Sequence, residues 1–87
     1  MPTVFIPALL QDLTDGKTTV EVDGINVRQV INALEQAHPG FLDRLLEDGQ
    51  VKPSISVAVD GEVAQMGMLE EVRETSEVHF INAIAGG

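Results

Sequence analysis

The last three residues, Ala85-Gly86-Gly87, are the part of the chain whose residue types best suit a chemical role. Glycine has no Cβ, so a Gly-Gly end reaches backbone angles closed to other residues and can pass through a narrow channel. Such an end suits a chain whose own terminal carboxylate must enter the active site of another protein. The reacting group would be the main-chain carboxyl of Gly87 rather than a side chain. A frayed end without a role is the alternative interpretation.

The side chains offer no comparable set of reactive groups. The chain has no cysteine and two histidines, so we expect no disulfide, no thiolate metal site and no catalytic thiol, and His79 is not expected to bind a metal. The sequence has no nucleophile–base pair and no phosphate-binding glycine loop. We therefore predict no catalytic residue, no metal site and no bound cofactor, and hence no enzyme.

The remaining candidates have structural interpretations. His38 stands at a predicted helix end, where a cation suits the helix dipole. Asp60-Gly61 is a turn sequence and is assigned no chemistry. Met66 and Met68 are expected in a loop or at the edge of the core. An acidic run is either solvated or part of a contact with a basic partner; its members are Glu70, Glu71 and Glu74.

Size and charge exclude several functional classes. The 87 residues, 44% of them hydrophobic, fit one small domain with a single core. The net charge is −9, and the five basic residues are scattered along the chain, which argues against nucleic acid and anionic membrane as partners. The acidic balance favours solubility or steering toward a basic partner. Because no signal peptide and no apolar run long enough for a membrane span are found, we expect a cytoplasmic protein.

Hydrophobic patterning predicts one main helix and a sheet. An Asn26 N-cap paired with Gln29 starts the helix, apolar residues follow at i, i+3, i+4 and i+7, and Pro39-Gly40 ends it. A short second helix is predicted over 41–46, whereas 8–13 is too short for a firm assignment. Strands are predicted at 3–6, 18–22, 55–59 and 78–82, with a brief return strand at 62–64 after the Asp60-Gly61 turn.

This order predicts an α+β fold in which a mixed sheet wraps around the main helix. Alternation along the strands places one set of residues toward the helix: Val4, Ile6, Val20, Val22, Ile55, Val57, Val59, Val78 and Phe80. Phe5, His79 and Ile81 then point to the outer face. An exposed apolar group on a small protein often marks an interface, so these three are the candidate partner-binding face, with scattered surface residues as the alternative.

The order of elements, with Val57-Ala58-Val59-Asp60-Gly61 in the middle and Gly-Gly at the end, resembles the β-grasp fold of ubiquitin-like proteins. Residues 76–87 align with the ubiquitin tail without a gap. The whole chain is similar to the prokaryotic sulfur carriers of the MoaD/ThiS family, and most to its CysO type, which serves cysteine biosynthesis. The residues that carry this likeness are Ile6-Pro7, Leu10, Thr14-Asp15-Gly16 and Ala83-Ile84-Ala85-Gly86-Gly87.

The resemblance implies a ubiquitin-like domain over 1–82, with four or five strands, and a flexible C-terminal tail over 83–87. It implies that a partner activating enzyme uses ATP to adenylate the carboxylate of Gly87, and that a sulfur donor displaces AMP to leave a thiocarboxylate. A second enzyme would then accept the sulfur. Four residues would be threaded into the partner: Ala83, Ile84, Ala85 and Gly86.

Several pathways and two other classes stay open. The acceptor would be a cysteine synthase homologue, with a metal-dependent peptidase as a further partner, or the large subunit of molybdopterin synthase. Small subunits of that synthase often carry Pro-Pro where this chain has Asn82-Ala83. Thiamine thiazole, thiolated tRNA and secondary metabolites are made with similar carriers. A protein modifier joined through Gly87 to lysines, or a regulatory subunit whose tail stays inserted in an enzyme, would use the same tail.

Overall fold

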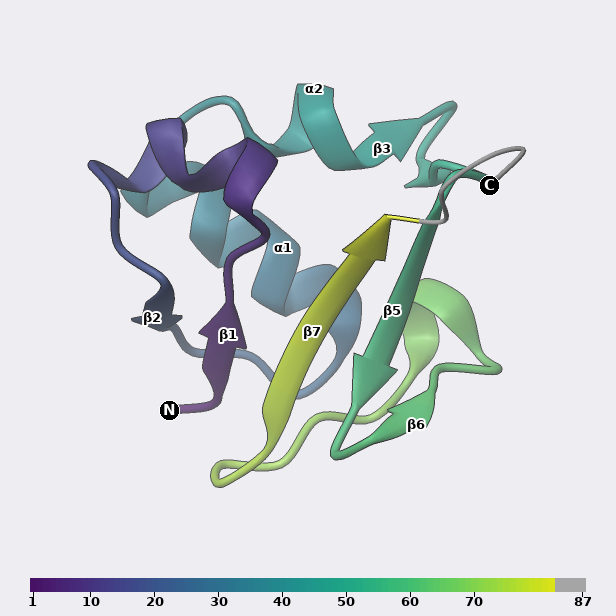
Figure 1. Cartoon of the computed structure of the whole chain (residues 1–87). Coiled ribbons are helices and arrows are strands. Elements are labelled where there is room, and N and C mark those ends of the chain that lie inside the picture. The colour runs from purple at the N-terminus through teal and green to yellow at the C-terminus, as the bar shows by residue number, and fades with distance from the viewer. Residues whose placement is uncertain (83–87) are drawn as a thin grey trace.

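The computed structural model describes residues 1–82, leaving aside the side chain of Asn82. Within this part, five strands form a mixed sheet and two further strands form a separate small hairpin. Helices connect them, and α1 crosses one face of the sheet (Figure 1). The elements are β1 (Thr3–Phe5), the 3-10 helix η1 (Ala8–Thr14), β2 (Thr19–Glu21), α1 (Val27–Ala37), α2 (Phe41–Leu45), β3 (Leu46–Glu47), β4 (Gln50–Val51), β5 (Ile55–Val59), β6 (Glu62–Val63), the 3-10 helix η2 (Gly67–Leu69) and β7 (Glu77–Asn82).

The last strand, β7, lies at the centre of the sheet, whose strand order is β2-β1-β7-β5-β6. It pairs in parallel with β1 and antiparallel with β5, and the two outer pairs are antiparallel hairpins. The sheet packs on one main helix, and the short α2 closes the end at which β7 finishes (Figure 1). This is the predicted α+β arrangement, a β-grasp fold.

The main helix forms where the sequence predicted it, because both its cap and its apolar stripe are present. The Asn26 side chain accepts a hydrogen bond from the Gln29 amide at 2.8 Å, and the Gln29 side chain accepts one from the Ile25 amide at 3.1 Å. Two backbone donors at the start of the helix are thereby satisfied. The buried stripe consists of Val27, Val30, Ile31 and Leu34, all with no exposed surface.

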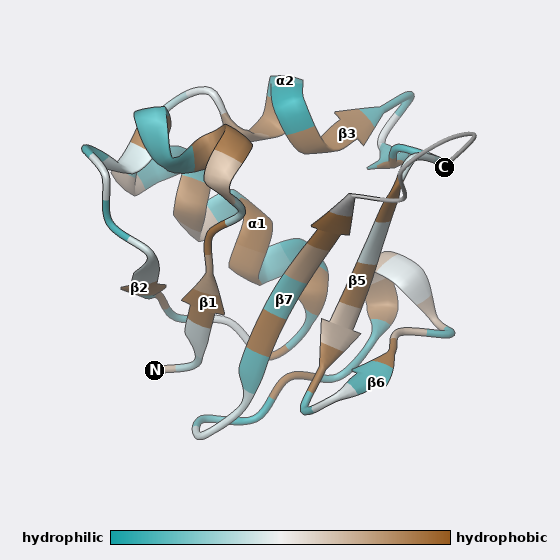
Figure 2. Cartoon of the chain, in the orientation of Figure 1, coloured by the Kyte–Doolittle hydropathy of each residue, from teal (hydrophilic) through white to brown (hydrophobic). Residues whose placement is uncertain are grey.

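The sheet supplies the other half of the core. Figure 2 shows hydrophobic and hydrophilic residues alternating along β7, as expected for a strand with one buried face. On the helix side, Val4, Val78 and Phe80 are at most 5% exposed. Three other residues predicted for this face, Val20, Ile55 and Val59, are half-buried and pack against the core.

Two predictions about the connections were incomplete. The segment after β1 forms η1, a 3-10 helix that buries Leu10 and Thr14. The second helix is one residue shorter than predicted, because Leu46 already belongs to the β3–β4 hairpin. That hairpin closes through Asp48 and Gly49, whose φ angles of 55° and 78° suit a two-residue turn.

The described residues also bear on membrane and metal binding. None of the helices within residues 1–82 is long and apolar enough to cross a bilayer. The same part of the chain brings no three His, Asp or Glu side chains together in a way that could hold a metal ion.

Candidate docking face beside the C-terminal strand

The strand that leads to the C-terminus is held on both sides. Its register is fixed by the pairs Phe5–His79 with β1 and Val57–Phe80 with β5. A central strand bonded along both edges belongs to the more stable part of a fold. The strand ends at Asn82. Residues 83–87, including the predicted threaded segment and Gly87, lie outside the described residues.

Alternation along β7 separates its core residues from its outer ones. Val78 and Phe80 are buried against the helix, while His79 is partly exposed and Ile81 is 48% exposed. Phe5 occupies the position on β1 opposite His79. Their rings are stacked, with centroids 4.1 Å apart and planes 7° apart. The structure thus brings Phe5 and His79 into contact and places Ile81 two residues further along on the same face.

The Phe5–His79 pair belongs to a row that crosses all five strands. Directly paired residues share one face of a sheet, and the register links them in order as Thr19, Phe5, His79, Ala58 and Val63. Ala58 is 7% exposed and Val63 is 63% exposed. We call this row, together with Ile81, the outer apolar row. Sequence analysis missed Val63 because its face depends on the register of the β5–β6 hairpin.

Acidic residues border this row on the side away from the C-terminus. The next register positions pair Glu77 with Thr3 and Thr3 with Glu21. The Glu77 carboxylate lies 3.8 Å from Nε2 of His79. The face is therefore apolar at its centre and carries carboxylates along one margin, a pattern typical of protein interfaces, which have apolar centres and polar rims.

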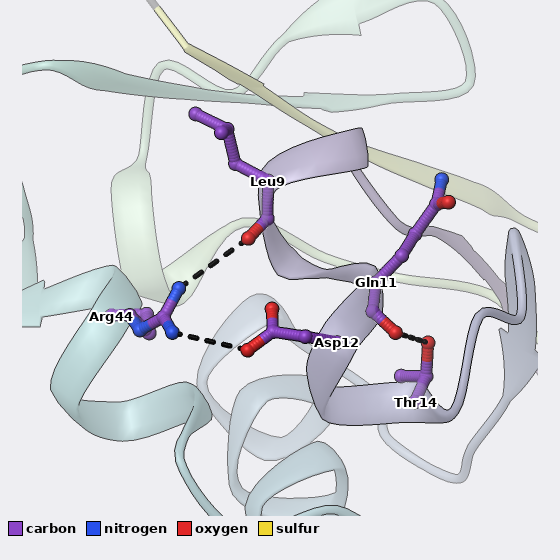
Figure 3. Close-up of polar contacts among 5 residues, drawn as sticks. All are labelled: Leu9, Gln11, Asp12, Thr14 and Arg44. Carbon is purple, nitrogen blue, oxygen red and sulfur yellow. Dashed lines mark hydrogen bonds and ion pairs between the residues drawn. The ribbon is translucent and has the colours of Figure 1, made fainter.

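An exposed leucine, Leu9 of η1, lies at the end of the sheet opposite the acidic margin. The Arg44 guanidinium is 3.3 Å from a carboxylate oxygen of Asp12 and donates to the carbonyl of Leu9 at 3.4 Å (Figure 3). The Thr14 hydroxyl donates to the Gln11 carbonyl at 3.3 Å. These contacts hold η1 in place while the Leu9 side chain points away from them and is 72% exposed. Its exposure could not be predicted from sequence, because the helical type of this segment was not assigned.

The start of β7 is tied to the β5–β6 turn. Asp60, in a left-handed conformation with φ 53°, accepts hydrogen bonds from the Glu77 amide at 2.9 Å and the Ser76 hydroxyl at 2.8 Å. The bond from Glu77 and then the bond from Ser76 lower the pKa of Asp60 below its ordinary value of 3.8; burial opposes this, and the nearby Arg73 charge makes a smaller contribution in the lowering direction. Asp60 thereby ties the β5–β6 turn to the start of β7.

The mixed sheet around one helix and the central last strand define the chain as a ubiquitin-like protein of the β-grasp class. A model of the ThiS family matches residues 4–87, nearly the whole chain. The chain belongs to the ThiS family.

Known relatives support this assignment. The chain is 36% identical over 67 residues to small archaeal modifier protein 3 of Haloferax volcanii, covering 75% of this chain and 73% of that protein. It is 28% identical over 90 aligned positions to the sulfur carrier protein CysO of Mycobacterium tuberculosis, covering 98% and 97%. A chain in the crystal structure of the BexX/CysO complex of Amycolatopsis orientalis superposes with a TM-score of 0.94 at 31% identity over the full length of both chains.

Proposed function

We propose that this chain is a sulfur carrier that bears sulfur as a thiocarboxylate on Gly87. The observation that carries the proposal is the match to the ThiS family, which continues through Gly87. The similarity to CysO also spans nearly the whole of both chains. The body formed by residues 1–82 has the task of presenting residues 83–87 to other enzymes, and the chain itself is a co-substrate rather than an enzyme.

The chemistry needs a partner because a carboxylate is a poor electrophile. An activating enzyme transfers AMP from ATP to a carboxylate oxygen of Gly87 and releases pyrophosphate. The sulfur donor then attacks the carbonyl carbon, the bond to AMP breaks, and a thiocarboxylate remains. The acid, base and metal groups for these steps belong to the activating enzyme.

The outer apolar row is the proposed docking face for that enzyme. Ordering five tail residues in a narrow channel costs on the order of 5–10 kcal/mol of backbone entropy. Contacts elsewhere on the body must offset this cost. His79 and Ile81 lie on the strand from which the tail continues, and Phe5 lies on the neighbouring strand, so a partner that binds them also receives the tail.

Cysteine biosynthesis is the first choice of pathway. Of the three proteins compared above, one is named sulfur carrier protein CysO and another comes from a BexX/CysO complex. The sulfur acceptor would then be a cysteine synthase homologue, with a metal-dependent peptidase releasing the product. Molybdenum cofactor biosynthesis, with this chain as the small subunit of molybdopterin synthase, is the second choice.

A second function is supported by a separate observation. The relative with 36% identity is a small archaeal modifier protein, so attachment of Gly87 to lysines of other proteins is the alternative. Both functions begin with the same adenylated terminus. They differ in the nucleophile that attacks it, which is sulfide in one case and a lysine amine in the other.

The test is a charging assay with the full chain, a cognate activating enzyme, ATP and sulfide. We expect intact mass to rise by the difference between sulfur and oxygen, with AMP released in equal amount. An unchanged mass and no ATP consumption would overturn the proposal. A mass unchanged by sulfide, together with isopeptide-linked adducts in cells, would replace the carrier with the modifier.

A further inference from the structure

A hollow of about 780 Å³ lies beside the β5–β6 hairpin. One wall is formed by the hairpin, including Val59 and Glu62, which are register partners on the helix side of the sheet. The other wall is formed by the segment around η2 and the approach to β7, with Met66, Glu71 and Arg73. We call this the hairpin hollow. It does not include Phe5, His79 or Ile81.

Hydrogen bonds hold both walls of the hollow. The Asp60 carboxylate joins the hairpin to Ser76 and Glu77. A carboxylate oxygen of Glu70 accepts a hydrogen bond from the Met66 amide at 3.1 Å, which holds the loop before η2. A site already held in shape loses less entropy when a ligand binds.

The charge of the hollow favours a cationic ligand. Four carboxylates line it, those of Asp60, Glu62, Glu70 and Glu71, against the single guanidinium of Arg73. Glu62 and Glu71 are exposed and form no side-chain hydrogen bond or ion pair within the described part of the chain. Their charges are therefore available to a partner.

Large apolar side chains lie around the same place. Val63 and Met66 line the hollow and are each 63% exposed. Leu69 does not line it, but it precedes the lining residue Glu70 in the chain and is 64% exposed. Unbranched methionine side chains adapt to the shape of a ligand. A partner that placed only charge here would leave this apolar surface in water, so the complementary ligand carries apolar side chains as well.

The open edge of the sheet at β6 favours a ligand with an extended backbone. β6 is the outermost strand next to β5, and the Ala64 amide bonds inward to the Val57 carbonyl at 2.7 Å. In an antiparallel ladder, inward and outward backbone groups alternate, so the N–H and C=O of Val63 face the open edge. An extended chain can add to such an edge.

We propose that the hairpin hollow binds an extended basic segment of a partner protein, in which Arg or Lys alternates with apolar residues. Added beside β6, such a segment directs every second side chain toward the hollow and the others toward the outer face. The cations meet Glu62 and Glu71, and the apolar side chains meet Val63 at the end of the outer apolar row. This binding does not depend on the chemistry of Gly87.

The test is a titration of the isotope-labelled full chain, followed by NMR, with the peptide Arg-Val-Lys-Val-Arg-Val-Lys-Val. We expect saturable shifts of the amides of residues 60–66 and 69–76, with little change in η1 and α2. Replacing the peptide cations by glutamine is expected to weaken binding at least tenfold. No saturable binding at millimolar peptide, or shifts spread evenly over the acidic surface, would overturn the proposal.

Matched variants distinguish peptide binding at the hairpin hollow from general attraction of a basic peptide to an acidic protein. Glu62→Lys with Glu71→Lys is expected to weaken peptide binding at least tenfold. Asp43→Lys with Glu47→Lys changes the net charge by the same amount on α2 and β3, and is expected to change binding less than threefold. Equal losses in the two double variants would contradict the proposal. An unchanged amide spectrum outside the substituted residues verifies that each variant is folded.

Discussion

The ring of Phe5 lies flat against the imidazole of His79, with 4.1 Å between the ring centroids. The two residues are register partners on the parallel strands β1 and β7. The pair therefore joins the first strand of the chain to the last one on the outer face of the sheet. Stacked aromatic pairs contribute about 0.5–1.5 kcal/mol beyond the area that they bury. This contact holds two side chains of the proposed docking face in one arrangement.

We predict that Phe5→Ala and His79→Ala weaken docking of the activating enzyme. Loss of a contact at the centre of an interface costs about 1–2 kcal/mol, so KM for the carrier is expected to rise roughly fivefold to thirtyfold. The rate of adenylation at saturation is expected to change little, because both side chains are proposed to act in docking and not in the chemistry at Gly87. Steady-state kinetics of pyrophosphate release provide the measurement. An unchanged KM in both variants would remove the outer apolar row from the interface.

Ile81 and Ile25 provide a matched comparison of two exposed isoleucines. Ile81 is 48% exposed in the outer apolar row, whereas Ile25 is 68% exposed on the connection before α1. We predict that Ile81→Ala raises KM for charging by about tenfold, equivalent to about 1.4 kcal/mol, and that Ile25→Ala leaves it within twofold. Equal effects of the two substitutions would show that general surface hydrophobicity, and not this face, determines docking.

The part of this face that was predictable from sequence is the part that depends on local alternation. A period of two along 78–82 places His79 and Ile81 outside once Val78 and Phe80 are assigned to the core. Val63 required the register of the β5–β6 hairpin, and Leu9 required the 3-10 helical form of η1. The β3–β4 hairpin was missed for a related reason. Its strands have two residues each, too few for alternation to be recognised.

Asp60 is predicted to make the free energy of unfolding depend on pH in the acid range. Its pKa is lowered in the folded chain by the bonds from Glu77 and Ser76, so the charged form is favoured by folding. The stabilisation is present above the ordinary pKa of 3.8 and is lost as pH falls through the lower folded value. We expect Asp60→Asn to lower the free energy of unfolding at pH 7 and to reduce its fall below about pH 4.

The measurement is urea unfolding between pH 2 and pH 7, with Asp43→Asn as the control. Asp43 is an exposed carboxylate in the first turn of α2 with no side-chain hydrogen bond among the described residues. We expect the control to keep the acid dependence of the wild type. If Asp60→Asn and wild type lost stability in parallel through the acid range, the Asp60 contacts would not be the cause.

Gly40 is predicted to be intolerant of a side chain. Its φ of 116° lies outside the region open to other residues, and an added Cβ would come within 2.8 Å of a methyl carbon of Leu13. Its amide also donates to the Glu35 carboxylate at 3.1 Å. We expect Gly40→Ala to destabilise the fold by about 1–3 kcal/mol. Gly49→Ala is the control for positive φ alone, since an added Cβ there meets nothing within 4 Å. A smaller loss at Gly40 than at Gly49 would contradict the steric argument.

Removal of Gly87 separates the roles of the body and the terminus. A chain that ends at Gly86 has the same core and the same outer apolar row, so its thermal unfolding temperature is expected to lie within about 1 °C of that of the full chain. The acyl carbon is then one residue short of the position it must reach in the activating enzyme, and a 1 Å misplacement of reacting atoms already costs about a hundredfold in rate. We therefore expect at least a hundredfold loss of thiocarboxylate formation, measured by intact mass, while the truncated chain still competes with the full chain for the enzyme. If the truncated chain were charged at the normal rate, the sulfur would not be carried on the terminal glycine. If the truncated chain no longer competed for the enzyme, the main binding energy would come from the tail and not from the sheet face.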